Sequence, residues 1–185
     1  MALAMVVLCV TGYFIGTPLP SVPGEAIDSY LMGYIRFAHF AAAYVFTVML
    51  LMRAYWAIVG NKQSREMFLV PLYVFQPSWW RSFFRVLGHY LFIRPQNDWH
   101  YGHNQLAMAA MFGMYLLGSV FMVVTGFALY GEGTGMGSWQ YNLFSSWVIP
   151  LFGQSQDVHT WHHVGMWYLI CFTIVHLYFV IREDI

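Results

Sequence analysis

Charged side chains are scarce in this sequence. Its 185 residues include eight Lys and Arg and eight Asp and Glu, so only 9% are charged, whereas 59% are hydrophobic. A typical soluble domain carries about 25% charged residues. So few charges cannot cover a water-soluble globule of this size, and we predict that much of the surface faces lipid. The net charge is zero with His neutral, so no attraction to nucleic acid is expected.

Cysteine is also rare. Cys9 and Cys171 both lie in apolar runs and have no metal-binding or redox spacing. We interpret them as small apolar packing residues. Aromatic residues, in contrast, make up 20% of the chain, which is typical of membrane interfaces and of packing around a large flat ligand.

Four apolar runs predict membrane-spanning helices. They cover residues 1–16, 31–59, 105–130 and 160–181. A spanning helix needs about 20 residues, so the first run is short, and we expect the given chain to begin inside its first membrane helix. Residues 131–157 are rich in glycine and predict an extramembrane loop. The sequence therefore predicts an all-α fold, a transmembrane four-helix bundle forming a single domain over residues 1–185.

The basic residues predict the orientation of this bundle. The loops 17–30 and 131–158 contain no Lys or Arg, whereas the connection 60–104 contains five: Lys62, Arg65, Arg81, Arg85 and Arg94. Basic loops stay on the cytoplasmic side of a bacterial inner membrane. We therefore expect a multi-pass inner-membrane protein with residues 60–104 in the cytoplasm.

An additional helix is predicted within the cytoplasmic connection, over residues 79–92. Arg81, Arg85 and His89 recur every four residues on one face. The opposite face is apolar and comprises Trp80, Phe83, Phe84, Leu87 and Leu91. This pattern is typical of a helix lying in the headgroup region, and equally of an amphipathic helix packed on protein.

Histidines lie within or at the edges of the predicted spans: His39, His159, His162, His163 and His176. Ionisable groups inside a membrane are costly and indicate a functional site. On a helix, His162 and His176 share a face, about 40° apart in projection and about 21 Å apart along the axis. His163 points nearly the opposite way, and His159 lies at the membrane edge.

Depth then suggests a partner for His162. His39 lies about two turns into the second span, and both spans enter from the outer side, so the two histidines can meet at one level. Two imidazoles facing each other across a bundle are typical of haem iron ligation. A structural zinc site needs four ligands, more than these two imidazoles supply. Copper ligation by methionine stays open, although twelve scattered Met residues fit packing better.

Two shorter features accompany these histidines. Arg36, one turn before His39, is placed to pair with a haem propionate or to extend to lipid headgroups. The segment Val10-Thr11-Gly12-Tyr13 is echoed by Val124-Thr125-Gly126-Phe127, and each is followed in the next span by an outer histidine. This echo suggests two helical hairpins of similar design.

Long motifs resemble a known family. They are TGYFIGTPLP (11–20), MGYIRFAHF (32–40), GNKQSRE (60–66), GHN (102–104), TGFALYGEG (125–133), GQSQDVHTWHHVGMW (153–167) and REDI (182–185). Over essentially the whole chain, the sequence resembles the B-type cytochrome subunit of membrane-bound nickel–iron uptake hydrogenases. More broadly, it is similar to the di-haem cytochrome b of formate dehydrogenase and thiosulfate reductase.

This resemblance implies two b haems. The outer haem would be held by His39 and His162, and the inner one by His176 and a histidine at the start of the first span. Residues 1–16 contain no histidine, so the second inner ligand is missing from this chain. Either the first span continues before Met1 and contains it there, or the inner haem is lost or ligated differently. The resemblance also implies a periplasmic iron–sulfur small subunit and a nickel–iron large subunit as partners. Electrons would pass to membrane quinone, for which His103 and Asn104 are candidate ligands.

Two other functions remain open on the sequence alone. The chain could anchor a different periplasmic dehydrogenase, such as formate dehydrogenase, or it could be a membrane subunit without haem. Co-purification would separate the first possibility, and absorbance near the b-haem α band would exclude the second. As the hydrogenase cytochrome that the resemblance implies, the chain is expected to be a non-catalytic electron-transfer subunit of a hydrogen:quinone oxidoreductase complex.

Overall fold

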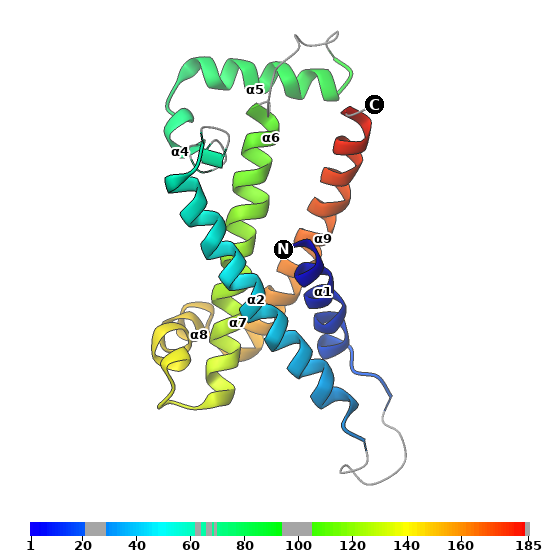
Figure 1. Cartoon of the computed structure of the whole chain (residues 1–185), viewed down its shortest axis with the longest axis vertical. Coiled ribbons are helices and arrows are strands. Elements are labelled where there is room, and N and C mark those ends of the chain that lie inside the picture. The colour runs from blue at the N-terminus through cyan, green and yellow to red at the C-terminus, as the bar shows by residue number, and fades with distance from the viewer. Residues whose placement is uncertain (21–28, 62–63, 66–67, 69, 94–104, 184–185) are drawn as a thin grey trace. The chain divides into compact units, whose positions relative to one another are not determined.

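The computed structural model describes residues 1–20, 29–61, 64–65, 68, 70–93 and 105–183 (Figure 1). Within these ranges the chain is helical and contains no strand, which confirms the prediction of an all-α fold. The longer helices are α1 (Ala2–Gly16), α2 (Leu31–Val59), α5 (Pro77–Tyr90), α7 (Leu117–Thr134) and α9 (Ser155–Glu183). The shorter elements are α4 (Val70–Tyr73), α6 (Gln105–Ala110), the π-helical segments η2 (Met111–Leu116) and η3 (Tyr141–Ser145), and α8 (Ser146–Phe152).

Two of the described helices are long and apolar enough to cross a membrane. They are α2, Leu31–Val59, and the continuous helix Gln105–Thr134 formed by α6, η2 and α7. Helix α1 is apolar but has only 15 residues. Helix α9 has 29 residues, but its histidines make it more polar. The helix bounds match the predicted runs closely, whereas four spans and their direction across the membrane stay predictions.

The chain divides into two compact units. The first comprises residues 1–52 and 118–185, and the second comprises residues 53–117. The first unit contains α1, most of α2, α7, α8 and α9, so it holds all the histidines predicted to bind haem. A single transmembrane domain over residues 1–185 stays a prediction.

Side-chain contacts connect the long helices of the first unit. Phe40 of α2 packs edge-on against Tyr130 of α7, with ring centroids 4.7 Å apart. Tyr13 of α1 meets Trp167 of α9 in the same way at 6.4 Å, and α1 and α9 lie side by side in Figure 1. Small residues let helices approach each other closely in membranes: a Cβ added to Gly118 of α7 would lie 3.1 Å from the Leu169 side chain of α9.

The segment after α7 is more ordered than the sequence predicted. Part of the predicted loop 131–157 folds as η3 and α8, so the loop prediction is wrong there. The hydroxyl of Ser145 donates a 2.6 Å hydrogen bond to the Ala128 carbonyl of α7. A Cβ added to Gly131 would lie 2.5 Å from the Ser145 Oγ, so only glycine permits this approach. Ala128, Val148 and Val158 then form a buried apolar cluster among α7, α8 and α9.

Helix α5 of the second unit occupies the position predicted for the additional helix, Pro77–Tyr90 instead of 79–92. It begins with Pro77, which is favourable at the first helical position because its missing N–H has no partner there anyway. Arg81 and Arg85 are exposed, as their spacing predicted. Trp79 and Val86 are buried, while Phe84 stays 59% exposed. An apolar face left open suits lipid, and the location of α5 at an interface stays a prediction.

Candidate functional site

The imidazole of His39 is held by α1. Its Nδ1 lies 2.9 Å from the hydroxyl of Thr11. That hydroxyl donates its single proton to the Val7 carbonyl, 2.6 Å away in the preceding turn. It therefore accepts from the histidine, so Nδ1 carries the ring proton and Nε2 keeps a free lone pair.

The same arrangement recurs at His162 of α9. Its Nδ1 lies 2.7 Å from the hydroxyl of Thr125 on α7. Thr125 is 1% exposed and donates to the Phe121 carbonyl at 2.8 Å. By the same proton count, Nδ1 of His162 is the donor, and its Nε2 is left as the nitrogen able to bind a metal.

A glycine follows each of these threonines and makes room for the ring. A Cβ added to Gly12 would lie 3.3 Å from Cε1 of His39, and one added to Gly126 would lie 3.2 Å from Cε1 of His162. Each imidazole therefore lies directly against the backbone of the neighbouring helix. The Thr-Gly echo between the first and third predicted spans thus has a structural counterpart. Each Thr-Gly pair contacts one histidine, and we call this pair of residues the seat of that histidine.

The two seated histidines lie near each other in the first unit. A Cβ added to Gly12 would lie 3.3 Å from Cε1 of His39. The Cβ position at Gly12 is also 3.5 Å from the Sδ of Met166, which lies one turn after His162 on α9. The donor set is thus a pair of imidazoles, each with Nε2 available, and this chemistry would suit the binding of haem iron.

The other predicted site residues lie elsewhere. His176 is exposed on α9 and stacks on Phe172, with ring centroids 5.5 Å apart. Arg36 is exposed on α2, one turn before His39. His103 and Asn104, the predicted quinone ligands, lie outside the described residues. Roles for all four stay predictions.

The two remaining histidines of α9 have different surroundings. His163 accepts a hydrogen bond through Nε2 from the Trp167 indole at 3.2 Å. Its ring also lies 3.0 Å from the Cβ position at Gly16 of α1. His159 is exposed. Neither of them is bonded to a threonine in the described part of the chain, so both differ from His39 and His162.

The Thr-Gly echo is visible in the sequence, but the sequence alone indicates no role for Thr11 or Thr125. Thr11 precedes His39 by 28 residues, and Thr125 precedes His162 by 37. The available signal was a Thr-Gly pair in one apolar helix and a histidine near the same membrane face in the next long helix. The contact itself depends on how the helices pack, which a single sequence does not specify.

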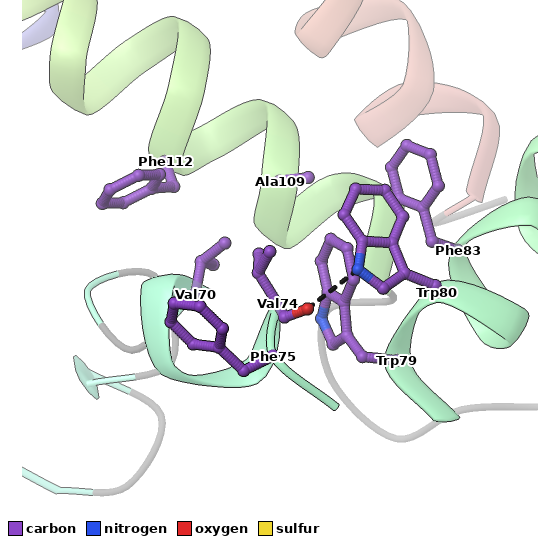
Figure 2. Close-up of a pocket in the computed structure, with 8 residues that line it drawn as sticks. All are labelled: Val70, Val74, Phe75, Trp79, Trp80, Phe83, Ala109 and Phe112. Carbon is purple, nitrogen blue, oxygen red and sulfur yellow. Dashed lines mark hydrogen bonds between the residues drawn. The ribbon is translucent and has the colours of Figure 1, made fainter. Parts of the chain in front are cut away.

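The second unit contains a separate apolar pocket of about 460 Å³. Figure 2 shows side chains from α4, α5 and the helix that begins at Gln105 gathered around it. Trp80 donates its indole N–H to the Val74 carbonyl at 2.8 Å. Trp79, only 8% exposed, also lines the pocket, but its buried indole N–H has no hydrogen-bond partner among the described residues. The pocket therefore has apolar walls, and one of its lining residues carries a buried indole N–H without a described partner.

Comparisons with known proteins agree with this chemistry. The sequence profile of the prokaryotic cytochrome b561 family matches residues 1–185. The chain is 59% identical over 184 residues to the probable Ni/Fe-hydrogenase B-type cytochrome subunit of Azotobacter chroococcum mcd 1, covering 100% of this chain and 75% of the relative. It is 51% identical over 189 residues to the probable Ni/Fe-hydrogenase 1 B-type cytochrome subunit of Escherichia coli K12, covering 99% of this chain and 77% of the relative. The chain therefore belongs to the prokaryotic cytochrome b561 family.

Proposed function

We propose that this chain is the haem b subunit that anchors a nickel–iron hydrogenase to the bacterial inner membrane and carries its electrons to quinone. The observation that carries the proposal is the pair of threonine-bonded imidazoles, His39 and His162, each with Nε2 available for a metal. The family supports the cofactor, because its members are cytochromes b. The names of the relatives support the hydrogenase partner.

In this proposal His39 and His162 hold one haem b near the outer face. The bound haem supplies a one-electron centre. The protein contributes the two ligands, the apolar surroundings and the close helix backbones at Gly12 and Gly126. The chain thus transfers electrons and does not itself oxidise hydrogen.

The remaining assignments follow from the same proposal. His176 contributes to a second haem near the inner face, and residues 1–16 supply no histidine as its partner. Arg36, exposed beside His39, pairs with a propionate of the outer haem. The iron–sulfur small subunit docks on the outer side, next to this haem, and the nickel–iron large subunit lies beyond it. Residues 60–104 face the cytoplasm.

Hydrogen itself provides the direct test. The full-length protein, purified from membranes with its associated subunits, is expected to show a reduced b-type α band when hydrogen is added. Dithionite should reduce the same absorbance, which calibrates the fraction of haem that hydrogen can reach. A protein that contains no haem would refute the cytochrome assignment, and haem reduced only by dithionite would refute the hydrogenase partnership.

Quinone requires a site of its own, and the pocket in the second unit has suitable chemistry. A quinone headgroup is a flat apolar ring with carbonyl oxygens that only accept hydrogen bonds. The pocket has a volume of about 460 Å³, within the range of small-molecule sites. The N–H of Trp79 has no partner among the described residues and is buried, so it would supply a donor to a quinone carbonyl once the indole ring turns toward the pocket. Ala109 also lines this pocket. The predicted quinone ligands His103 and Asn104 lie shortly before Ala109 in the sequence.

A Trp79→Phe variant is expected to weaken quinone use while leaving haem reduction by hydrogen unchanged. Loss of one neutral hydrogen bond costs about 0.5–1.5 kcal/mol, so the KM for quinone should rise roughly two- to tenfold. Steady-state hydrogen:quinone assays over a range of quinone concentrations measure this change. Trp80→Phe is the matched control, because its N–H is already bonded to the Val74 carbonyl. Equal KM values in the Trp79 variant and the unmodified protein would contradict the assignment of this pocket.

A further inference from the structure

We infer that Thr11 and Thr125 are positioning residues for the two haem ligands, an inference that rests on the proposed function of His39 and His162. Each threonine fixes its histidine in the tautomer that presents Nε2 to iron, and each sets the rotation of the ring. Neither residue has been assigned a role by composition, spacing or motif.

The proton count supports this role. A threonine hydroxyl has one proton, and in both cases a backbone carbonyl one turn earlier takes it, Val7 for Thr11 and Phe121 for Thr125. The oxygen can then only accept from Nδ1 of the histidine. A protonated Nδ1 leaves Nε2 as the basic nitrogen, which is the form that a metal ligand requires.

The geometry supports it independently. The two Oγ1–Nδ1 distances are 2.9 Å and 2.7 Å, within the normal range for a hydrogen bond. The threonine defines the edge of the ring that faces its helix, and the following glycine lets the ring lie against the backbone there. Two neighbouring residues thus act together, one by bonding to the ring and one by lacking a side chain.

The arrangement occurs twice, on different helices. Thr11 and Gly12 seat His39 from α1, and Thr125 and Gly126 seat His162 from α7. Two other threonines serve as an internal comparison. Thr47 of α2 and Thr173 of α9 make the same bond to a carbonyl one turn earlier, both at 2.8 Å, but the bonds described for them go to backbone only. An ordinary helical threonine therefore does not account for the pairing with histidine.

A hydrogen bond accepted from Nδ1–H increases the electron density of the imidazole and so favours ferric over ferrous iron. Removing the acceptor should raise the midpoint potential of that haem. We expect Thr11→Val and Thr125→Val each to shift the ferrous-to-ferric ratio at a fixed potential by up to about tenfold, which is about 59 mV for a one-electron couple. The double variant should shift further in the same direction.

The test is a spectroscopic redox titration of the full-length protein with its partner subunits, combined with a haem count. Thr11→Ser and Thr125→Ser retain the hydroxyl, so the midpoint potential of these variants should equal that of the unmodified protein. Thr47→Val and Thr173→Val, which remove a hydroxyl that bonds to backbone, should leave the potential unchanged. The readout is the position of the couple, which a purely structural loss of protein would not move.

Two results would overturn the inference. One is an unchanged potential in both Thr→Val variants with haem fully retained. The other is a shift of equal size in Thr→Ser, which would show that the hydroxyl is not the group responsible. Either result would leave the haem proposal standing, because that proposal fails only if the unmodified protein lacks haem or if haem content is independent of His39 and His162.

Discussion

A His162→Ala variant is expected to lose one b haem per chain while the protein still inserts and assembles. His162 lies inside α9, and alanine is the most favourable residue for a helix interior, so the helix itself should persist. The iron, in contrast, loses one of its two proposed imidazole ligands. Pyridine haemochrome measured per chain gives the haem count directly, and the same sample gives the hydrogen-driven reduction of quinone.

That hydrogen-driven reduction of quinone should fall by roughly tenfold or more in His162→Ala, since removing only a residue that supports a metal ligand already costs about 10–100-fold. His159→Ala is the matched control. It is the same substitution three residues earlier on α9, at an exposed side chain. The proposal would fail if both variants retained the same haem content as the unmodified protein. Loss of haem from His159→Ala alone would mean that His159, and not His162, is the ligand.

The helix boundaries were predictable from the sequence because they depend on local composition. Helix α2 begins and ends where its apolar run does, at Leu31 and Val59. Helices α1 and α9 also follow their runs to within a few residues. In a lipid environment, backbone polar groups must bond within their own segment, so a long apolar run has few structures open to it other than a helix.

The helical segment between α7 and α9 was not predictable in the same way. Its neighbourhood contains several glycines, a composition that predicts a loop. One of them, Gly131, instead permits close contact between Ser145 and α7. The folding of η3 and α8 depends on this contact and on the burial of Val148 against Ala128. Both are tertiary interactions, and a single sequence does not reveal which residues of distant segments will meet.

The candidate site likewise combines features that local sequence predicts with features that depend on tertiary contacts. The pairing of His39 with His162 was inferred from helical spacing and depth, both of which are properties of single helices. The roles of Thr11 and Thr125 depend on the rotation of one helix against another, and only the contacts to Nδ1 expose them. The pocket beside Trp79 was missed for a related reason, because its walls come from three segments that are separated in the sequence.

A Gly126→Val variant is expected to disturb the haem almost as strongly as loss of a ligand, although it removes no functional group. The Cβ at this position would lie 3.2 Å from Cε1 and 3.9 Å from Nε2 of His162. The two additional methyl groups of valine would then press on the ring. Overpacking of this kind costs typically about 1–3 kcal/mol, which corresponds to roughly 5- to 150-fold weaker haem retention.

The size of this effect should depend on the size of the side chain and on its position. Gly126→Ala needs a movement of only a few tenths of an ångström, so its haem content should lie between those of the unmodified protein and Gly126→Val. Gly133→Val is the matched control near the end of the same helix, where an added Cβ meets nothing within 4 Å. Haem content and the α-band position, measured across the three variants, separate loss of space for the ring from a general effect of valine in α7. Full haem content with an unshifted band in Gly126→Val would mean that His162 does not need the backbone of α7 beside it, and the seat proposed for this ligand would have to be abandoned.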